Sequence, residues 1–242
     1  LVVLRGTHDG HCQQHGNWLE ISHPDYLIPS GPFLASQRSS FGAHDGDCQQ
    51  RGTCGSSDEM VLNVNVMGPK RVVDSFQSFL DPAGSRIVNL GSGAGPMYVE
   101  KQSLQRKKHF VNPNITWEEI QADMDRGVPE DDPAHSSGLG SYGLSKALLS
   151  SYTMLLASEL KDKNVSVFCL TPGYIDTAIT AGWDGGKPAE EGTVAIRHCL
   201  FEAKPEESGW FFGSDAKRSP LHVLRNPGEP VFDGNVLLHE VN

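Results

Sequence analysis

Short apolar runs alternate along this chain with stretches of helical periodicity, and this alternation constrains the fold more than any other feature. The runs 86–90 and 165–170 are too short for helices, and a glycine-containing turn follows each, which is typical of buried parallel strands. Apolar spacing predicts helices over about 58–80, 141–161 and 188–201, and a short last strand at 209–213. Alternating helices and strands favour βαβ units, so the sequence predicts an α/β fold built on a parallel sheet.

An excess of acidic residues limits the partners that the chain can bind. With 20 Lys and Arg against 30 Asp and Glu, the formal net charge is −10, whereas binding to nucleic acid or to an anionic membrane needs a basic face. No apolar run reaches the roughly 18 residues that a membrane span requires. The opening residues resemble neither a secretory signal nor a transit peptide, and the cysteines form no disulfide framework. We therefore expect a cytoplasmic protein that binds neither nucleic acid nor a membrane.

Residues 1–57 differ in character from the rest of the chain. They contain no lysine and no sustained helical period, and one short histidine- and cysteine-containing segment is nearly repeated within them. A metal-binding interpretation would use His11, Cys12, His15, Cys48 and Cys54. Their spacing matches no standard zinc pattern. We therefore interpret 1–57 as an irregular leader, predict no metal site, and assign the folded, chemistry-bearing part to 58–242.

A polar stretch, 97–138, separates the first predicted strand from the helix over 141–161. Within it, Thr116 and Glu119 form a capping box, which predicts the start of a short helix. The glycine-rich segment 91–96 before it, and the Pro-, Asp- and Gly-rich segment 127–140 at its end, are typical of loops. The stretch is therefore expected to be an insertion between two regular units of the fold.

A tyrosine and a lysine four residues apart begin the helix over 141–161. Tyr142 and Lys146 share one helical face at this spacing. An ammonium beside a phenol favours the phenolate, and such a pair can exchange a proton with a carbonyl or alcohol oxygen. By simple counting such pairs also arise by chance, so the spacing alone does not distinguish a catalytic pair from a solvated one.

The position of the pair in the predicted fold makes the catalytic interpretation stronger. Ser92 directly follows one predicted strand, and the segment Thr171–Thr177 follows another. Tyr142 begins a helix between these two strands. Ligands of open parallel sheets bind beyond the carboxyl ends of the strands, so the three groups are expected to converge at one edge of the sheet.

Four motifs in this order resemble the short-chain dehydrogenase/reductase family. The matching segments are Asn63–Gly68, Ile87–Ser92, Tyr142–Lys146 and Pro172–Thr177. The long gap between Ser92 and Tyr142 resembles the carbonyl-reductase-like, often monomeric, branch. The resemblance implies a Rossmann-like doubly wound parallel sheet, and an enzyme that reduces a carbonyl or oxidises an alcohol with NADP(H) or NAD(H), the branch favouring NADP(H).

The resemblance also implies a role for each site residue. Tyr142 would be the general acid/base, and Lys146 would favour its phenolate and bind the nicotinamide ribose. Ser92 would orient the substrate carbonyl, and Asn65 would hold a water in a proton relay. The cofactor would be bound by Tyr142, Lys146, Pro172, Gly173, Ile175 and Thr177.

The family's glycine-rich cofactor loop is not recognisable near the start of the sequence. Three βα units and a fourth strand would precede the helix that begins at residue 58, and they would need roughly 90 residues, whereas 57 precede it. The sheet is therefore expected to be incomplete at its N-terminal side. Two alternatives to an active reductase remain open: a truncated, non-catalytic relative that acts as a binding or regulatory protein, and an unrelated α/β domain.

Overall fold

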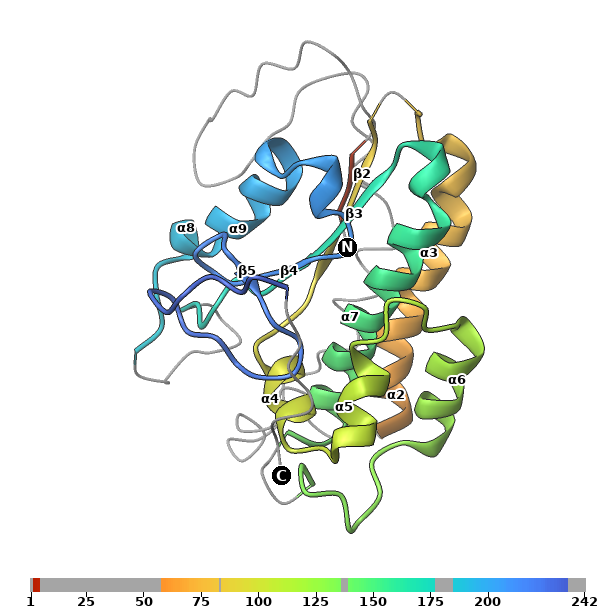
Figure 1. Cartoon of the computed structure of the whole chain (residues 1–242), viewed down its shortest axis with the longest axis vertical. Helices are drawn as coiled ribbons and strands as arrows, with labels where there is room; N and C mark the ends of the chain where they lie inside the picture. The colour runs from red at the N-terminus through yellow and green to blue at the C-terminus, as the bar shows by residue number, and fades with distance from the viewer. Residues whose placement is uncertain (1, 5–57, 83, 136–138, 177–184, 235–242) are drawn as a thin grey trace.

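The protein is built around a five-stranded mixed sheet. The computed structural model describes residues 2–4, 58–82, 84–135, 139–176 and 185–234 (Figure 1). The strands, which lie side by side in chain order, are β1 (Val2–Leu4), β2 (Arg86–Leu90), β3 (Ser166–Leu170), β4 (Phe211–Phe212) and β5 (Arg218–Ser219). The central pairs β2–β3 and β3–β4 are parallel, and the two outer pairs are antiparallel.

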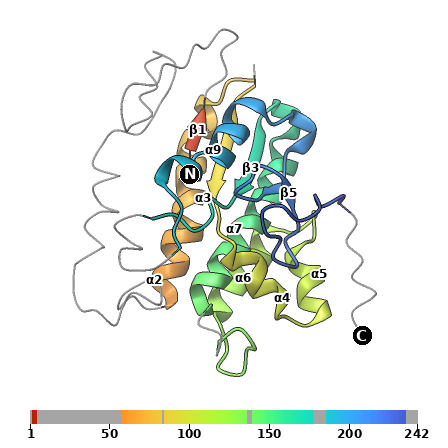
Figure 2. The same cartoon turned by 90° about the vertical axis from the view of Figure 1, so that its left-hand side faces the viewer.

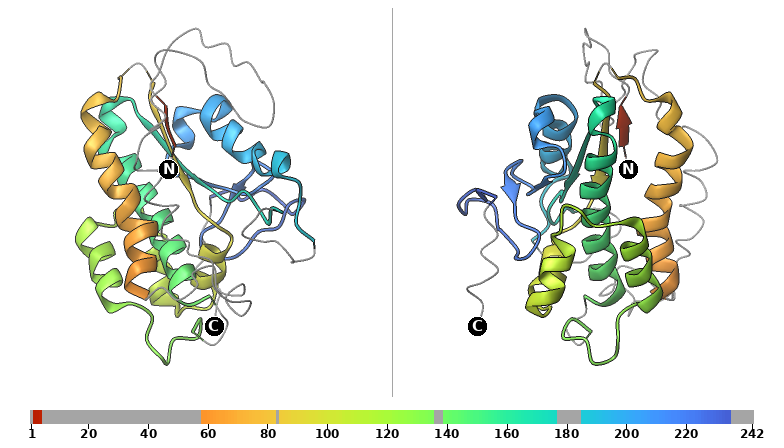
Figure 3. Two further views of the ribbon diagram at one scale, coloured as in Figure 1. Left: turned by 180° about the vertical axis from the view of Figure 1, so that it is seen from behind. Right: turned by 45° about the vertical axis from the view of Figure 1, so that its right-hand side comes forward.

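Helices cover both faces of the sheet (Figures 1 and 3). One layer holds α7 (Gly140–Glu159) and a continuous helical segment made of α2 (Asp58–Leu62), the π-helical turn η2 (Asn63–Met67), α3 (Gly68–Phe76) and the 3₁₀ turn η3 (Gln77–Phe79). The other holds α8 (Ala189–Gly192), α9 (Val194–Arg197) and the π-helical turn η5 (His198–Glu202). Further 3₁₀ turns are η4 (Lys161–Lys163) and η6 (Pro205–Glu207). The expected doubly wound α/β fold is confirmed.

Alternating residues of the strands supply two separate cores. Ile87 and Val167 pack into the larger core, beneath α7 and the α2–α3 segment. Their chain neighbours Val88 and Phe168 pack into the second core with residues of α9 and η5. Successive side chains of a strand point to opposite faces, so two covered faces require continuous apolar runs, as the sequence shows at these strands.

Three short helices between β2 and α7 pack against α7 (Figure 2). They are α4 (Ala94–Glu100), α5 (Leu104–Phe110) and α6 (Trp117–Arg126), and all three contact α7. The capping box predicted at Thr116 and Glu119 is present at the start of α6. The buried Asp123 carboxylate joins α6 to α5 through ion pairs with Arg106 at 2.8 Å and His109 at 2.7 Å. The sequence predicts a loop over 91–96, but residues 94–96 form the first turn of α4.

Other differences from the expected elements lie near the C-terminal end. The helix expected over 188–201 consists of three consecutive short segments, α8, α9 and η5. The strand expected over 209–213 pairs with β3 only at Phe211 and Phe212, and β5, which the sequence did not predict, pairs with it from the other side. A two-residue strand is too short to show the alternation on which sequence prediction depends.

The strand β1 does not take the place of the first strand of a Rossmann sheet. Val2 pairs with Val88 and Leu4 with Arg86, so β1 runs antiparallel to its neighbour β2. The first strand of a doubly wound sheet runs parallel to its neighbours. Residues 2–4 therefore form a strand within the segment expected to be an irregular leader, and its direction differs from that of a first Rossmann strand.

The predictions for residues 5–57, including the irregular leader and the candidate metal ligands, concern residues outside those that the structure describes. Among the helices that the structure describes, none combines the length and the apolar character needed to cross a bilayer.

Candidate functional site

The ends of β2 and β3 bring two of the predicted segments to the same edge of the sheet. Leu90 pairs with Leu170 in parallel register, and both strands end there. The chain continues into Ser92 after one strand and into Pro172 after the other. Because parallel strands end at the same edge, these two segments leave the sheet side by side.

Tyr142 and Lys146 lie in the first turns of α7, the helix that packs on this part of the sheet. The Lys146 Nζ lies 5.6 Å from the centre of the Tyr142 ring and donates a hydrogen bond of 3.0 Å to the carbonyl oxygen of Leu90. That carbonyl is only two residues before Ser92. Burial lowers the pKa of the Lys146 ammonium. The structure thus joins the Tyr–Lys pair to the strand end that carries Ser92.

Close backbone packing fixes Ser92 relative to Lys146. A Cβ atom at Gly95 would lie 3.0 Å from the carbonyl carbon of Lys146, so the backbones of α4 and α7 approach each other closely there. A Cβ at Gly91 would lie 2.8 Å from the Sγ of Cys169. Glycine at both positions allows these approaches. The Ser92 Oγ accepts a hydrogen bond of 3.2 Å from the backbone N–H of Ala94, which leaves its own hydrogen available to a ligand.

Asn65 lies in the π-helical turn η2, where the sequence predicted a regular helix. Its Nδ2 donates a hydrogen bond of 3.0 Å to the Oγ of Ser145, one residue before Lys146 in α7. The Ser145 hydroxyl in turn donates to the carbonyl oxygen of Tyr142 at 2.7 Å. Single π turns occur frequently at functional sites. Asn65 is therefore tied by side-chain hydrogen bonds to the same turn of α7 that carries Tyr142 and Lys146.

The segment after β3 forms a compact turn that the C-terminal part of the chain supports. Gly173 has a φ of +85°, and a Cβ there would lie 2.9 Å from the Cβ of Ser214, so a larger residue would not fit. Ile175 forms an isolated bridge with Lys187. Thr177, the last predicted cofactor contact, lies outside the described residues. The structure therefore places Pro172, Gly173 and Ile175 in one turn at the edge near Ser92.

A C-terminal loop lies against the Ser92 segment. The Leu224 Cδ1 is 3.2 Å from where a Cβ of Gly93 would be. The neighbouring Arg225 holds this loop in place through hydrogen bonds of 2.6 and 3.0 Å to both carboxylate oxygens of Asp215. The hydrogen bonds from Arg225 lower the pKa of Asp215. Leu224 thus forms part of the surroundings of Ser92, although nothing in its sequence context had indicated this.

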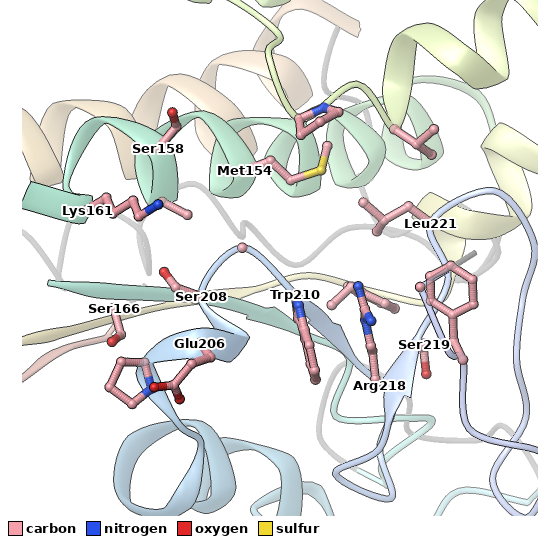
Figure 4. Close-up of a pocket in the computed structure, with 18 of the residues that line it drawn as sticks. Met154, Ser158, Lys161, Ser166, Glu206, Ser208, Trp210, Arg218, Ser219 and Leu221 are labelled. Carbon is pink, nitrogen blue, oxygen red and sulfur yellow. The ribbon is translucent and has the colours of Figure 1, made fainter. Parts of the chain in front are cut away.

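The large cavity of about 860 Å³ lies away from these residues. It is lined by the second half of α7, including Met154 and Ser158, and by Trp210 and Arg218 from the β4–β5 region (Figure 4). Met154 is about 12 Å along the helix axis from Lys146, at 1.5 Å per residue. Of the predicted site residues that the structure describes, none lines this cavity.

Sequence reasoning missed Ser145, the residue that links Asn65 to α7. Ser145 is fully buried, but a single buried serine in a helix has no periodic signal that separates it from a packing residue. The available clue was its place between Tyr142 and Lys146, inside a motif already considered functional.

Comparisons with known proteins identify relatives of this chain. Residues 134–187 match the family model described as short chain dehydrogenase, a segment that contains the Tyr142–Lys146 pair and the turn after β3. The chain is 28% identical over 163 residues to (+)-neomenthol dehydrogenase of Arabidopsis thaliana, over 64% of this chain and 54% of that protein. It is 39% identical over 71 residues to dehydrogenase/reductase SDR family member 4 of Oryctolagus cuniculus, over 29% of this chain and 27% of that protein.

A solved structure shares the fold. Salutaridine reductase from Papaver somniferum superposes with a TM-score of 0.50 and 23% sequence identity, over 74% of this chain and 65% of that chain. This chain spans only part of its curated relatives: 54% of the length of (+)-neomenthol dehydrogenase and 27% of that of dehydrogenase/reductase SDR family member 4.

Proposed function

We propose that this chain, which belongs to the short-chain dehydrogenase/reductase family, is an oxidoreductase that reduces a small carbonyl compound or oxidises the corresponding alcohol. The folded part over 58–242, with its insertion at 97–138, would carry the catalytic residues. The observation that carries the proposal is the contact between Lys146 and the Leu90 carbonyl at 3.0 Å. It brings an ammonium beside the Tyr142 ring and next to the strand end that leads to Ser92.

The nicotinamide-ribose end of a dinucleotide fits the residues at this edge. An ammonium has three N–H donors, and within the described residues the Lys146 Nζ uses one of them, on Leu90. Two donors therefore remain for the hydroxyls of a ribose, beside the Tyr142 hydroxyl. Pro172, Gly173, Ile175 and Thr177 would contact the carboxamide and the adjoining phosphate. A nicotinamide cofactor would supply or accept the hydride, and NADP(H) is proposed over NAD(H) from the carbonyl-reductase-like arrangement of the sequence.

The protein groups would manage the proton and the position of the substrate. The Ser92 hydroxyl would donate a hydrogen bond to the substrate carbonyl, because its hydrogen is not used in its contact with Ala94. The Tyr142 hydroxyl would deliver the proton to the same oxygen, or remove it from an alcohol. Asn65 would hold a water that replaces the proton on Tyr142. To test this proposal, the consumption of NADPH or NADH would be monitored by absorbance in the presence of a panel of small aldehydes and ketones.

Cofactor binding is expected to be weak. Fixed backbone N–H groups at a helix start normally hold the pyrophosphate of a dinucleotide, and the sequence offers no recognisable glycine-rich loop for this. NADPH and NADH, titrated separately by calorimetry and by cofactor fluorescence, should bind with dissociation constants well above about 1 μM, the value that corresponds to −8.2 kcal/mol.

Each other outcome of the titration has a definite meaning. Submicromolar binding of either cofactor would show that residues 1–57 supply a phosphate site, and the expectation of an incomplete nucleotide-binding half would be wrong. A folded chain that binds neither cofactor would contradict the proposed function and would favour a non-catalytic binding protein.

We further propose that the chain acts as a monomer. Members of the family commonly dimerise through the helix that carries the catalytic tyrosine, and here α6 packs against that helix, with the Trp117 ring 5.6 Å from the Tyr152 ring. The net charge of −10 adds repulsion between copies. Multi-angle light scattering should therefore give the mass of one chain, 26.3 kDa. A stable dimer built on α7 would contradict this.

A further inference from the structure

The large cavity beside the second half of α7 has the properties of a ligand site that the proposed reaction does not use. Its volume of about 860 Å³ lies within the range of about 300–1,000 Å³ that is usual for small-molecule sites. Its walls combine apolar side chains, such as Met154 and Leu221, with a few polar groups. Lys146 and the other described residues of the proposed catalytic site do not line it, so a ligand bound here would leave that site free.

Arg218 is held in a fixed orientation at one wall of this cavity. Its guanidinium carbon lies 3.9 Å from the centre of the Trp210 ring and 5.2 Å from that of the Phe232 ring. The chain passes close to it again at Gly234, where a Cβ would lie 2.5 Å from the Nη1 of Arg218. The guanidinium points from the β4–β5 side toward Met154 of α7 (Figure 4). These contacts present the edge of the guanidinium to the cavity.

The guanidinium of Arg218 has unused hydrogen-bond donors. An arginine side chain carries five N–H groups in a planar fork, and none of them donates to another residue that the structure describes. Asp233 and Glu207 contribute negative charge nearby, but the fork itself stays available. An arginine that stacks on aromatic faces can still bind two oxygens of a carboxylate along its edge.

Two further features of the cavity favour a ligand with anionic oxygens. The charged side chains among its lining residues are Lys161, Arg218 and Glu206, so positive charge is in excess there, although the whole chain has a net charge of −10. His222 also lines it and packs edge-on against Phe232, which contacts Arg218. The buried Nδ1 of His222 has no hydrogen-bond partner among the described residues. This nitrogen can donate to an oxygen when it carries the ring proton.

We propose that this cavity is a second ligand site, which binds a small organic carboxylate with an aromatic or branched apolar body. Arg218 would bind the carboxylate through two parallel hydrogen bonds, and Met154 and Leu221 would contact the apolar body. The proposal needs neither a bound cofactor nor turnover, so it can fail or succeed independently of the function proposed above.

Calorimetric titration of the full chain with 2-naphthoate tests the proposal, with 2-naphthamide as a neutral probe of the same shape. We expect 2-naphthoate to bind with a dissociation constant below about 1 mM. The amide should bind about tenfold more weakly or worse, because it lacks the charge-assisted hydrogen bonds to the guanidinium. Inorganic phosphate, which has no apolar body, should also bind more weakly.

Three results of these titrations would overturn the proposal. The first is no binding of 2-naphthoate at about 1 mM. The second is equal affinity for 2-naphthoate and 2-naphthamide, which would show that the guanidinium is not used. The third is phosphate binding as tight as that of 2-naphthoate, which would show that the apolar walls are not used.

An arginine outside the cavity provides a matched control. Arg218→Gln should weaken 2-naphthoate binding by about tenfold or more, because it removes the charged fork. Arg197 is exposed at the end of α9 and does not line the cavity. Arg197→Gln removes the same charge from the chain and should leave the affinity unchanged. Equal affinities in the two variants would contradict the role of Arg218.

A variant on the opposite wall covers the case in which Arg218→Gln does not fold. Met154 is partly buried and points into the cavity from α7 (Figure 4), so Met154→Trp would fill the space of the apolar body. It should weaken 2-naphthoate binding by about tenfold or more and melt close to the wild-type temperature. Lys146→Met should leave this binding unchanged. Normal binding in Met154→Trp, or loss of binding in Lys146→Met, would overturn the proposal.

Discussion

Replacement of Tyr142 by phenylalanine is expected to lower kcat by about 10² to 10⁴-fold, the usual contribution of a positioned proton donor. The substitution deletes one hydroxyl and preserves the ring that lies 5.6 Å from the Lys146 Nζ. The helix start and its packing should therefore persist, and KM for the cofactor should change little. Steady-state kinetics at saturating cofactor, together with a thermal melt of the variant, would measure both effects.

Tyr152 provides the control for this substitution. It lies on the same helix, is almost fully buried, and packs edge-on against Trp117. Burial raises the pKa of its hydroxyl above the ordinary range for tyrosine. Tyr152→Phe should leave kcat unchanged within about twofold, because the Tyr152 side chain packs against Trp117 and lies outside the proposed site. Retention of turnover by Tyr142→Phe would disprove the assignment of Tyr142 as acid/base.

Replacement of Lys146 by methionine is expected to affect turnover and cofactor affinity together. The ammonium would both favour the phenolate of Tyr142 and bind the nicotinamide ribose, so its removal should reduce kcat by about 10²-fold or more and weaken binding of NADPH and NADH alike. Methionine is close in volume, and replacing a buried charge with a well-packed apolar side chain is often neutral for stability. The loss of function should therefore occur in a protein that melts near the wild-type temperature.

Lys161, an exposed lysine in the turn that follows α7, is the matched control. Lys161→Met also removes one positive charge from the chain and should leave both kcat and cofactor affinity unchanged. A variant Lys146→Met with normal cofactor affinity but low kcat would show that Lys146 acts on Tyr142 alone and does not bind the ribose. Normal kcat in that variant would contradict the catalytic role.

The central part of the fold could be predicted because its signals are local. The apolar runs of β2 and β3 are continuous since both sheet faces are covered, and α7 begins at a motif recognisable by spacing. The capping box at Thr116 predicted the start of α6 correctly for the same reason: both partners lie within three residues. Where structure depends on contacts between neighbouring residues in the chain, the sequence was sufficient.

Features that depend on distant contacts could not be predicted. The π-helical turn at Asn65 has the same composition as a regular helix, and its orientation involves Ser145, which is 80 residues away. In the sequence, Gly91 indicated a loop. In the structure, glycine is needed there because a Cβ atom would lie 2.8 Å from the Sγ of Cys169 in the neighbouring strand. The pairing of β5 with β4 similarly depends on a reversal of the chain between two very short strands. The candidate site was therefore predicted as a set of reactive groups, without the residues that support them.

The direction of β1 determines how a further parallel strand could be added beside β2. Because Leu4 pairs with Arg86, at the start of β2, the chain leaves β1 at the end of the sheet opposite Ser92. A strand that ran parallel to β2 in this position would instead end at the edge that carries Ser92. A grafted Rossmann half would have to displace β1 and bring its own strand against β2 in the parallel direction.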